Sequence, residues 1–318
     1  MKRKFTIGSR GSDLALWQTE TIKKELEKRF PQAEFEIRII KTTGDAVLDK
    51  ALSKIGDKGL FTRQIETALL AGEIDFAVHS LKDLPTVQPE NLVIGAVSAR
   101  ETPNDAFISK NFASLDALPQ NAKVATGSLR RRSQLLNFRP DLEIVEIRGN
   151  VPTRIQKFLE SDLDAMILAC AGLQRLGLES HIRQTLPFEI MLPAVGQGVM
   201  AVEMREDDAE VAALLGEIND AAVEACITAE RAFLRSLEGG CQVPIAAFAE
   251  IDGGEIFLRG FVGDLNGARN IRESLRGKAD EAHRIGENLA EICLQKGAAE
   301  ILNEARRAAE NSSQEVLQ

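Results

Sequence analysis

Cys241 is the residue whose setting most suggests covalent chemistry. It stands in LEGGCQVPIA (237–246), directly after Gly239 and Gly240. The two glycines can form a helix C-cap, and they also leave the thiol unhindered on a loop. A helix C-terminus does not activate a thiol, and no base is paired with Cys241 in the sequence, so a protease-type nucleophile is disfavoured. The setting fits better a thiol that reacts once and then serves as a covalent anchor.

Basic side chains recur directly after the strands that the sequence predicts. In open parallel sheets, ligands bind beyond the carboxyl ends of the strands. Arginine binds carboxylates and phosphates through two parallel hydrogen bonds. A single arginine is more often a solvated residue paired with a local acid, but the whole set predicts a cleft for a small polyanion. The set consists of Arg10, Lys82, Arg130, Arg131, Arg132, Arg148, Arg154 and Arg175, with Ser9, Ser12, Ser128 and Asn150 beside them.

Asp83, in HSLKDLPT, lies among these basic residues. Its carboxylate could form an ion pair with Lys82 and do nothing more. It could also stabilise a cationic intermediate and transfer protons, which is general acid–base chemistry. The spacing alone leaves both interpretations open.

Composition restricts the class of protein. The chain has 318 residues, 44% of them hydrophobic, which is enough for a sizeable core and for two or three domains. The net charge of −9 argues against a general nucleic-acid-binding protein. No apolar run approaches the roughly 20 residues of a membrane span, and the N-terminus MKRKFTIGSR lacks the apolar segment of a signal peptide. We therefore expect a soluble cytoplasmic protein with no membrane or nucleic-acid partner.

The cysteines and histidines do not form a recognisable metal site. Cys170, Cys226, Cys241 and Cys293 contain no C-x-x-C pair, and the three histidines are far apart along the chain. A zinc site is therefore not supported, and a disulfide framework is not expected in a reducing cytosol. Except for Cys241, the cysteines lie in apolar stretches, and we expect them to be core residues.

Strands alternate with helices through the first two thirds of the chain. This alternation predicts parallel sheets with right-handed crossovers, and hence two doubly wound α/β domains. We expect crossings between them at 100–106 and 193–198, and a returning strand at 201–204. The expected strands are 4–8, 35–40, 74–80, 123–126, 142–147 and 164–170, and the helices follow Ser12, span 60–71 and 129–137, and start near Pro152.

The last third has a different pattern. A helix over about 219–237 is followed by three antiparallel strands, with turns at DGG (252–254) and LNG (265–267). A final helix over 279–296 and a frayed tail, ENSSQEVLQ, complete a small α+β domain. The expected domains are therefore 1–99 with 200–217, then 100–199, and then 218–318, which carries Cys241.

Several stretches together resemble one family, porphobilinogen deaminase, also called hydroxymethylbilane synthase. They occur in the family's order over residues 8 to about 250, and the remainder fits the family's small third domain. Jointly they are highly specific, whereas one G-x-G alone would mean little. The stretches are GSRGSDLALWQT, KTTGD, DKGLFTRQIE, DFAVHSLKDLPT, TGSLRRRSQL, RGNVPTR, LACAGLQRLGL, LPAVGQG and LEGGCQVPIAAFAE.

The resemblance implies a transferase of porphyrin and haem biosynthesis. It would join four porphobilinogen molecules head to tail, releasing ammonia at each step, into the linear tetrapyrrole hydroxymethylbilane. Cys241 matches the cysteine that holds a dipyrromethane cofactor through a thioether. Asp83 matches the catalytic aspartate, which would assist ammonia loss and stabilise positive charge on pyrrole nitrogens, with Lys82 and Arg10 beside it. No metal is implied.

Further matched positions would bind the acetate and propionate groups of the cofactor and the growing chain. Because every pyrrole ring carries two such carboxylates, the resemblance implies that the set of arginines binds them. Asp13, Gly127 and Pro152 depart from common family residues, so anion affinity could differ there. The implied cofactor contacts are Ser12, Lys82, Asp83, Thr126, Ser128, Arg130, Arg131, Arg148 and Arg154. The implied substrate contacts are Arg10, Gln18, Asp45, Lys54, Arg148, Arg154, Arg175 and Gln197.

Two other classes of protein share part of the pattern. Bilobal solute-binding proteins also have two α/β lobes with two crossings, so a binding protein for a small polyanion is the alternative. Such proteins need neither Asp83 nor an anchored thiol, and most carry an export signal. A nucleic-acid protein that uses the arginine run 130–132 is disfavoured by the acidic charge, the lack of tyrosine and the single tryptophan. No coiled-coil heptads occur, so we expect a monomer.

Overall fold

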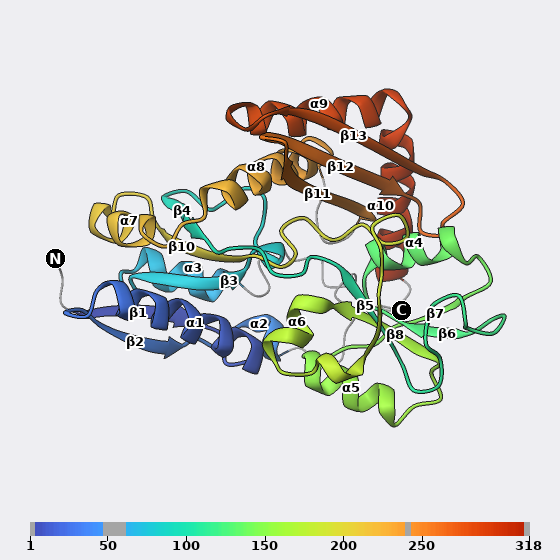
Figure 1. Cartoon of the computed structure of the whole chain (residues 1–318), viewed down its shortest axis with the longest axis horizontal. Coiled ribbons are helices and arrows are strands. Elements are labelled where there is room, and N and C mark those ends of the chain that lie inside the picture. Colours follow the sequence, from blue (N-terminus) through green and yellow to red (C-terminus); the bar gives the residue numbers. More distant parts are fainter. Residues whose placement is uncertain (1–3, 47–61, 239–242, 315–318) are drawn as a thin grey trace. The chain divides into compact units, whose positions relative to one another are not determined.

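The computed structural model describes residues 4–46, 62–238 and 243–314 of the chain (Figure 1). Contacts divide the chain into two compact units. Among the described residues, the first comprises 4–46, 62–101 and 198–224, and the second comprises 102–197, 225–238 and 243–314. Two of the passages between the units, at 101–102 and 197–198, lie in the stretches expected as crossings. The division into three domains stays a prediction.

The first unit is built on a five-stranded sheet in the order β2-β1-β3-β10-β4. β1 runs parallel to β2 and β3, whereas β10 runs antiparallel to β3 and β4. The expected return strand is confirmed as β10, but the sequence pattern missed β4, because no α-helix separates it from β3. The strands are β1 (Lys4–Ser9), β2 (Glu34–Ile39), β3 (Phe76–Ser80), β4 (Leu92–Val97) and β10 (Met200–Arg205).

Helices cover both faces of this sheet. Phe76 and Val78 of β3 pack in one core with residues of α1 and α7, while Ala77, between them in the strand, packs against Ile65 and Leu69 of α3. This alternation follows from the two-residue period of a strand. The helices are α1 (Asp13–Arg29), α2 (Thr43–Ala46), α3 (Arg63–Leu70) and α7 (Ala209–Gly216), and the short 3-10 helix η2 (Leu81–Asp83) follows β3.

The second unit contains a sheet of the same kind, in the order β7-β6-β8-β5-β9. β6 is parallel to β7 and β8, and β5 is antiparallel to β8 and β9. The expected pair of parallel-type α/β sheets is thus confirmed, although each includes antiparallel strands. The strands are β5 (Asp105–Ser109), β6 (Lys123–Ala125), β7 (Glu143–Val145), β8 (Ala165–Ala169) and β9 (Ile182–Thr185). The helices are α4 (Leu129–Phe138), α5 (Val151–Leu159), α6 (Cys170–Arg175) and the 3-10 helix η3 (Glu179–His181).

The C-terminal part carries the expected small antiparallel sheet. Its order is β11-β12-β13, and Figure 1 shows α9 lying along it. The strands are β11 (Ile245–Asp252), β12 (Glu255–Gly263) and β13 (Asn270–Lys278). The helices are α8 (Ala221–Ser236), the 3-10 helix η4 (Ala279–Glu281), α9 (Ala282–Gln295) and α10 (Ala298–Gln314).

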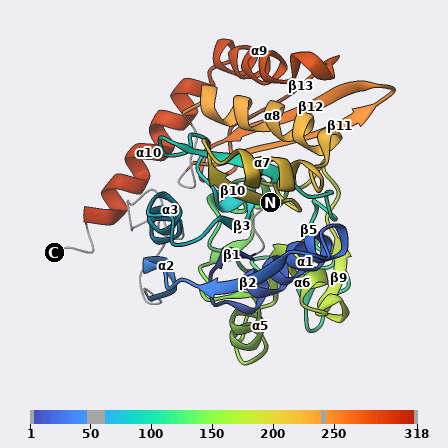
Figure 2. The ribbon, with the colours of Figure 1, turned by 90° about the vertical axis from the view of Figure 1, so that its left-hand side faces the viewer.

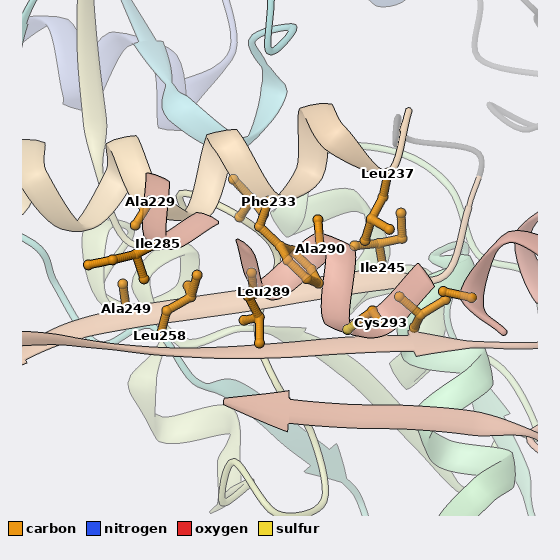
Figure 3. Close-up of a cluster of buried hydrophobic side chains, with 14 of the residues drawn as sticks. Ala229, Phe233, Leu237, Ile245, Ala249, Leu258, Ile285, Leu289, Ala290 and Cys293 are labelled. Carbon is orange, nitrogen blue, oxygen red and sulfur yellow. The ribbon is translucent and has the colours of Figure 1, made fainter. Parts of the chain in front are cut away.

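The two faces of this sheet contribute to different cores. Ala249 of β11 packs with Phe233 of α8 and Leu289 of α9 in the cluster shown in Figure 3. Phe248, the preceding residue, faces the other side and packs with Leu192, which belongs to the loop before the second crossing. The C-terminal sheet is therefore packed between its own helices and the rest of the second unit.

The end of the chain differs from expectation. The helix at 279–296 is not the final one, because α10 follows after Gly297, whose φ of 99° ends α9. Ala298, Ile301 and Leu302 are spaced along one helical face and are buried in the same cluster as α9. The tail expected to fray is helical as far as Gln314. Figure 2 shows α10 leaving the end of α9 at a steep angle.

Three cysteines lie within the described residues, and all three are buried, as expected of core residues. Cys170 begins α6 instead of ending the preceding strand, whereas Cys226 and Cys293 lie in the C-terminal cluster. No described helix combines the length and the apolar character needed to cross a membrane.

Candidate active site

A pocket in the first unit brings together side chains from three elements. It lies where β1 and β3 end and α1 begins. Four of the predicted site residues, Arg10, Ser12, Gln18 and Asp83, line it together. The complete lining is Arg10, Ser12, Leu14, Ala15, Gln18, Thr62, Val78, His79, Ser80 and Asp83.

Strand direction explains why these residues meet. β1 and β3 are parallel neighbours, so their carboxyl ends lie at the same edge of the sheet. Arg10 follows β1 directly, and Lys82 and Asp83 form η2 directly after β3. Ser12 is the N-cap of α1, and its hydroxyl accepts a hydrogen bond from the backbone N–H of Ala15 at 3.4 Å.

Gln18 connects α1 to the end of β3. Its Nε2 donates to the hydroxyl of Ser80 at 2.8 Å, and its side chain is almost fully buried. Asp83, by contrast, is exposed at the mouth of the pocket, and Lys82 beside it is half-buried. The pocket therefore has a fixed polar wall and an accessible carboxylate, with the guanidinium of Arg10 in the same lining.

In the second unit, one carboxylate binds two of the predicted arginines. Arg130 Nη1 donates to Asp105 Oδ2 at 2.7 Å, and Arg131 Nη2 donates to Asp105 Oδ1 at 2.8 Å. All three side chains are buried. Burial opposes the charge on Asp105, but the two guanidiniums outweigh it and hold the pKa of this carboxyl well below its usual range. Two cations share one anion, so one positive charge remains for an acidic ligand.

Further contacts hold the same cluster. Gln197 Nε2 donates to Asp105 Oδ1 at 2.9 Å and to the carbonyl of Pro103 at 2.7 Å. Arg130 also donates to the carbonyl of Leu192 at 2.8 Å. The nitrogen of the Gln197 side chain is therefore engaged within the protein. Its Oε1 is buried and accepts no hydrogen bond from the part of the chain that the structure describes.

Thr126 and Ser128 form the start of α4. The hydroxyl of Thr126 accepts a hydrogen bond from the backbone N–H of Ser128 at 3.2 Å. Ser128 is the N-cap of the helix, where its hydroxyl accepts from the N–H of Arg131 at 3.4 Å. Both side chains thus fix the helix terminus that carries the two arginines, which is a structural role in addition to the predicted ligand contact.

The other predicted arginines lie on or beside α5 and α6. Arg148 precedes α5, Arg154 lies within it, and Arg175 is the buried last residue of α6. Burial lowers the pKa of Arg148, although Glu146 at 3.9 Å opposes this shift. Its Nη1 is buried and has no hydrogen-bond partner among the residues described, so this guanidinium can still donate to a ligand.

Three predicted site residues cannot be placed by their side chains. Cys241 and Lys54 lie outside the described residues, and Asp45 is placed only as part of the backbone of α2. The anchor role of Cys241 therefore stays a prediction. No group of side chains suited to hold a metal ion occurs within 4–44, 62–238 and 243–308.

Sequence reasoning missed the buried acids. Asp105 falls within the expected crossing 100–106, Glu230 within the expected helix 219–237, and Glu203 within the expected returning strand 201–204, and the sequence pattern singles out none of them. Each is fully buried. A signal existed in AVEM (201–204) and DAFIS (105–109), because an acid within or beside an apolar strand must have a partner when it is buried.

The basic and acidic side chains at the sheet edges, with the small antiparallel sheet, define an α/β protein built to bind an acidic small molecule. The family model described as "Porphobilinogen deaminase, dipyromethane cofactor binding domain" matches residues 5–213, and that of the "Porphobilinogen deaminase, C-terminal domain" matches residues 224–295. The chain therefore belongs to the porphobilinogen deaminase family.

Individual relatives agree with this membership. The chain is 53% identical to the porphobilinogen deaminase of Chlorobaculum parvum over 310 residues, which cover 96% of this chain and 99% of that one. It is 50% identical to the enzyme of Desulforamulus reducens over 306 residues, with the same coverage. Among solved structures, the methionine-binding protein MetQ shares 16% identity with a TM-score of 0.44, covering 68% of this chain and 89% of that chain. The sulphonate-binding protein SsuA from Escherichia coli has a TM-score of 0.39 at 16% identity, covering 75% and 71%.

The residues present fit the cofactor that the family binds. A dipyrromethane carries several carboxylates, and the second unit offers the excess positive charge of the Arg130–Arg131–Asp105 cluster. It also offers Nη1 of Arg148, which makes no hydrogen bond to any of the described residues. Such groups bind carboxylates in bidentate fashion.

Proposed function

We propose that this protein condenses four porphobilinogen molecules head to tail into hydroxymethylbilane, with release of ammonia at each step. The dipyrromethane cofactor, bound through a thioether to Cys241, would supply the covalent primer for the chain. Family membership supports this activity. The observation that carries the assignment of residues is the exposed carboxylate of Asp83 in one pocket with Arg10.

Asp83 has the role of stabilising positive charge. Loss of ammonia from the aminomethyl group leaves a cation that is delocalised over the pyrrole nitrogen, and a carboxylate within the pocket lowers the energy of that cation. The same carboxylate can accept a hydrogen bond from a pyrrole N–H. Arg10 orients the substrate by binding its carboxylates. Lys82, next to Asp83, adds a second cation for the acidic side chains.

The remaining basic residues have the role of holding the acidic chain. Arg130 and Arg131 present the surplus positive charge of a pair fixed by Asp105, so binding a carboxylate there costs little reorganisation. Arg148, Arg154 and Arg175 provide further contacts as the product lengthens. Cytoplasmic location, a monomeric state and the absence of membrane or nucleic-acid partners are parts of the same proposal.

The decisive experiment is the intact mass of the denatured, reduced protein. We expect an excess equal to two pyrrole units in the wild type and no excess in Cys241→Ser. Cys226→Ala is the matched control, because this buried thiol lies in the C-terminal core and should leave the excess unchanged. If the wild type shows no excess and cannot acquire one from porphobilinogen, a two-lobed binding protein for a polyanion becomes the better assignment.

A second experiment addresses Asp83. The Asp83→Asn variant should fold and keep the mass excess but lose most turnover of porphobilinogen. Glu90→Gln is a suitable control, since Glu90 is an exposed carboxylate in the loop between η2 and β4. Near-normal turnover in Asp83→Asn would contradict the catalytic role of Asp83. It would not contradict the attachment of the cofactor to Cys241.

A further inference from the structure

A buried pair of titratable side chains lies directly beneath the pocket that contains Asp83. His79 of β3 and Glu203 of β10 approach to 3.1 Å between Nε2 and Oε2, with side chains 4% and 0% exposed. The two strands are antiparallel, with His79 opposite Ala201 and Glu203 opposite Ala77. The pair is therefore a diagonal neighbour pair on one face of the sheet.

A third titratable group belongs to the same cluster. Glu66 of α3 is buried, and burial raises its pKa, as does the nearby Glu203. The hydroxyl of Thr62 and the imidazole of His79 act in the opposite direction. Two carboxylates and one imidazole thus share a buried volume between α3 and the sheet, where an unshared charge would be expensive.

This cluster reaches the pocket through His79. Both His79 and Thr62 line the pocket, together with Arg10 and Asp83. The surrounding α3 residues Ile65 and Leu69 are apolar, so packing alone does not require an acid here. A buried ion pair adds little to stability compared with well-packed apolar residues, which makes a purely structural role a weak explanation.

Within the part of the chain that the structure describes, the elements packed around His79, Glu203 and Glu66 carry few other charged side chains that face them. On α3, Arg63 is exposed and contributes to lowering the pKa of Glu66. On β10, Arg205 points elsewhere, donating to the carbonyls of Leu69 and Ile74. From the pocket side, the charged groups are Arg10, Asp83 and, beside it in η2, Lys82.

We infer that Glu203 is a positioning residue for the reaction at Asp83. Its Oε2 lies 3.1 Å from Nε2 of His79, and an ionised carboxylate there places negative charge next to a pocket in which positive charge develops when ammonia leaves. Glu203 touches no substrate and acts through the imidazole. The inference rests on the proposed function, because it assigns the developing charge to that reaction.

The test combines turnover with imidazole NMR. Glu203→Gln keeps an acceptor for His79 but removes the charge, and Glu206→Gln, an exposed neighbour on the same chain segment, is the control. We expect Glu203→Gln to lower kcat by about tenfold with KM within about twofold, and Glu206→Gln to change neither. The mass excess on Cys241 should be the same in all three proteins.

The imidazole readout separates positioning from loss of fold. The chain has three histidines, so the ¹⁵N signals of His79 can be assigned by its absence in His79→Asn. In Glu203→Gln these signals should shift, while those of His181 and His283 should stay. A kcat within twofold of the wild type, or unmoved His79 signals, would overturn the inference. If Glu203→Gln does not fold, His79→Asn and Glu66→Gln provide the same kinetic comparison.

The design also distinguishes failure of the proposed function. If wild-type protein lacks both the mass excess and turnover, the proposed function fails, and the NMR comparison still tests whether Glu203 influences the imidazole of His79. If the wild type is active and loaded but Glu203→Gln is kinetically normal, only the positioning role fails.

Discussion

Arg130 on α4 donates a hydrogen bond to Asp105 on β5 across 2.7 Å, although the two residues are 25 positions apart in the sequence. Arg131 donates to the other oxygen of the same carboxylate at 2.8 Å. Asp105 thus aligns two guanidiniums that the sequence had suggested only as separate ligand contacts. Both guanidiniums are therefore held by contacts within the protein.

Replacing Asp105 by Asn should therefore destabilise the protein strongly. The variant leaves two buried guanidiniums without their anion, and loss of one partner of a buried ion pair costs about 3–5 kcal/mol. Chemical denaturation at pH 7 measures the change in the free energy of unfolding. Asp252→Asn is the control, because Asp252 and its partner Arg276 are both about half exposed and such pairs contribute about 1 kcal/mol or less. Equal effects in the two variants would contradict the prediction.

The same carboxylate predicts a pH dependence. The pKa of Asp105 is depressed in the folded state, so its contribution to stability is fully present above about pH 4, the ordinary carboxyl value. It is lost as the pH falls further toward the folded-state pKa. The difference in unfolding free energy between wild type and Asp105→Asn should therefore shrink below about pH 4. If the difference in unfolding free energy grew on acidification, the pKa of Asp105 could not be depressed in the folded state, and the prediction would be wrong.

Two leucines on α9 offer a matched test of the C-terminal core. Leu289 is fully buried in the cluster of Figure 3, whereas Leu294 is 39% exposed. Leu289→Ala should cost about 2–5 kcal/mol, because it leaves a cavity among Phe233 and Leu258, and Leu294→Ala should cost less than about 1 kcal/mol. Urea unfolding of both variants measures this. Similar losses would mean that α9 packs differently.

A glycine sets the close approach of α8 and α9. A Cβ at Gly286 would overlap the carbonyl of Ala229 and lie 2.7 Å from the Cβ of Ala232. Gly286→Ala should therefore destabilise the protein by about 1–3 kcal/mol through overpacking. At Gly216 of α7 a Cβ would meet nothing within 4 Å, so Gly216→Ala should be neutral or slightly stabilising. Thermal unfolding distinguishes these outcomes, and a neutral Gly286→Ala would exclude the close contact.

Thiol labelling tests the assignment of the core cysteines. Burial raises the pKa of Cys170 to about 11 and that of Cys293 to about 12, so neither presents a reactive thiolate at pH 8. Iodoacetamide should modify Cys170, Cys226 and Cys293 only after denaturation, as measured by peptide mass spectrometry. Rapid labelling of any of them in the native protein would contradict the burial.

The elements that the sequence predicted well are those with local signals. The N-cap at Ser12, the proline in the first turn of α5 and the three C-terminal strands follow from residue types over a few positions. β4, β5, β9 and α10 were not predicted. Their placement depends on which strands pair and on the core that α10 completes, and neither is encoded in a short window.

The candidate site shows the same division. Order of strands and helices placed Arg10, Ser12, Lys82 and Asp83 at one sheet edge, because parallel strands end together, and the structure has them there. The sequence could not indicate that Asp105 would hold Arg130. That contact requires β5 to lie antiparallel beside β8, which is a choice of strand neighbours.

By itself, the sequence determined the family, the α/β class and the identity of the residues that carry charge near the site. These depend on residue type and spacing, which can be read directly from the sequence. Only the tertiary structure decided which titratable side chains meet: Asp105 with Arg130 and Arg131, and Glu203 with His79. The physical reason is that an ionised side chain buried in a sheet needs a partner within about 3 Å. That partner comes from whichever strand or helix the fold places next to it.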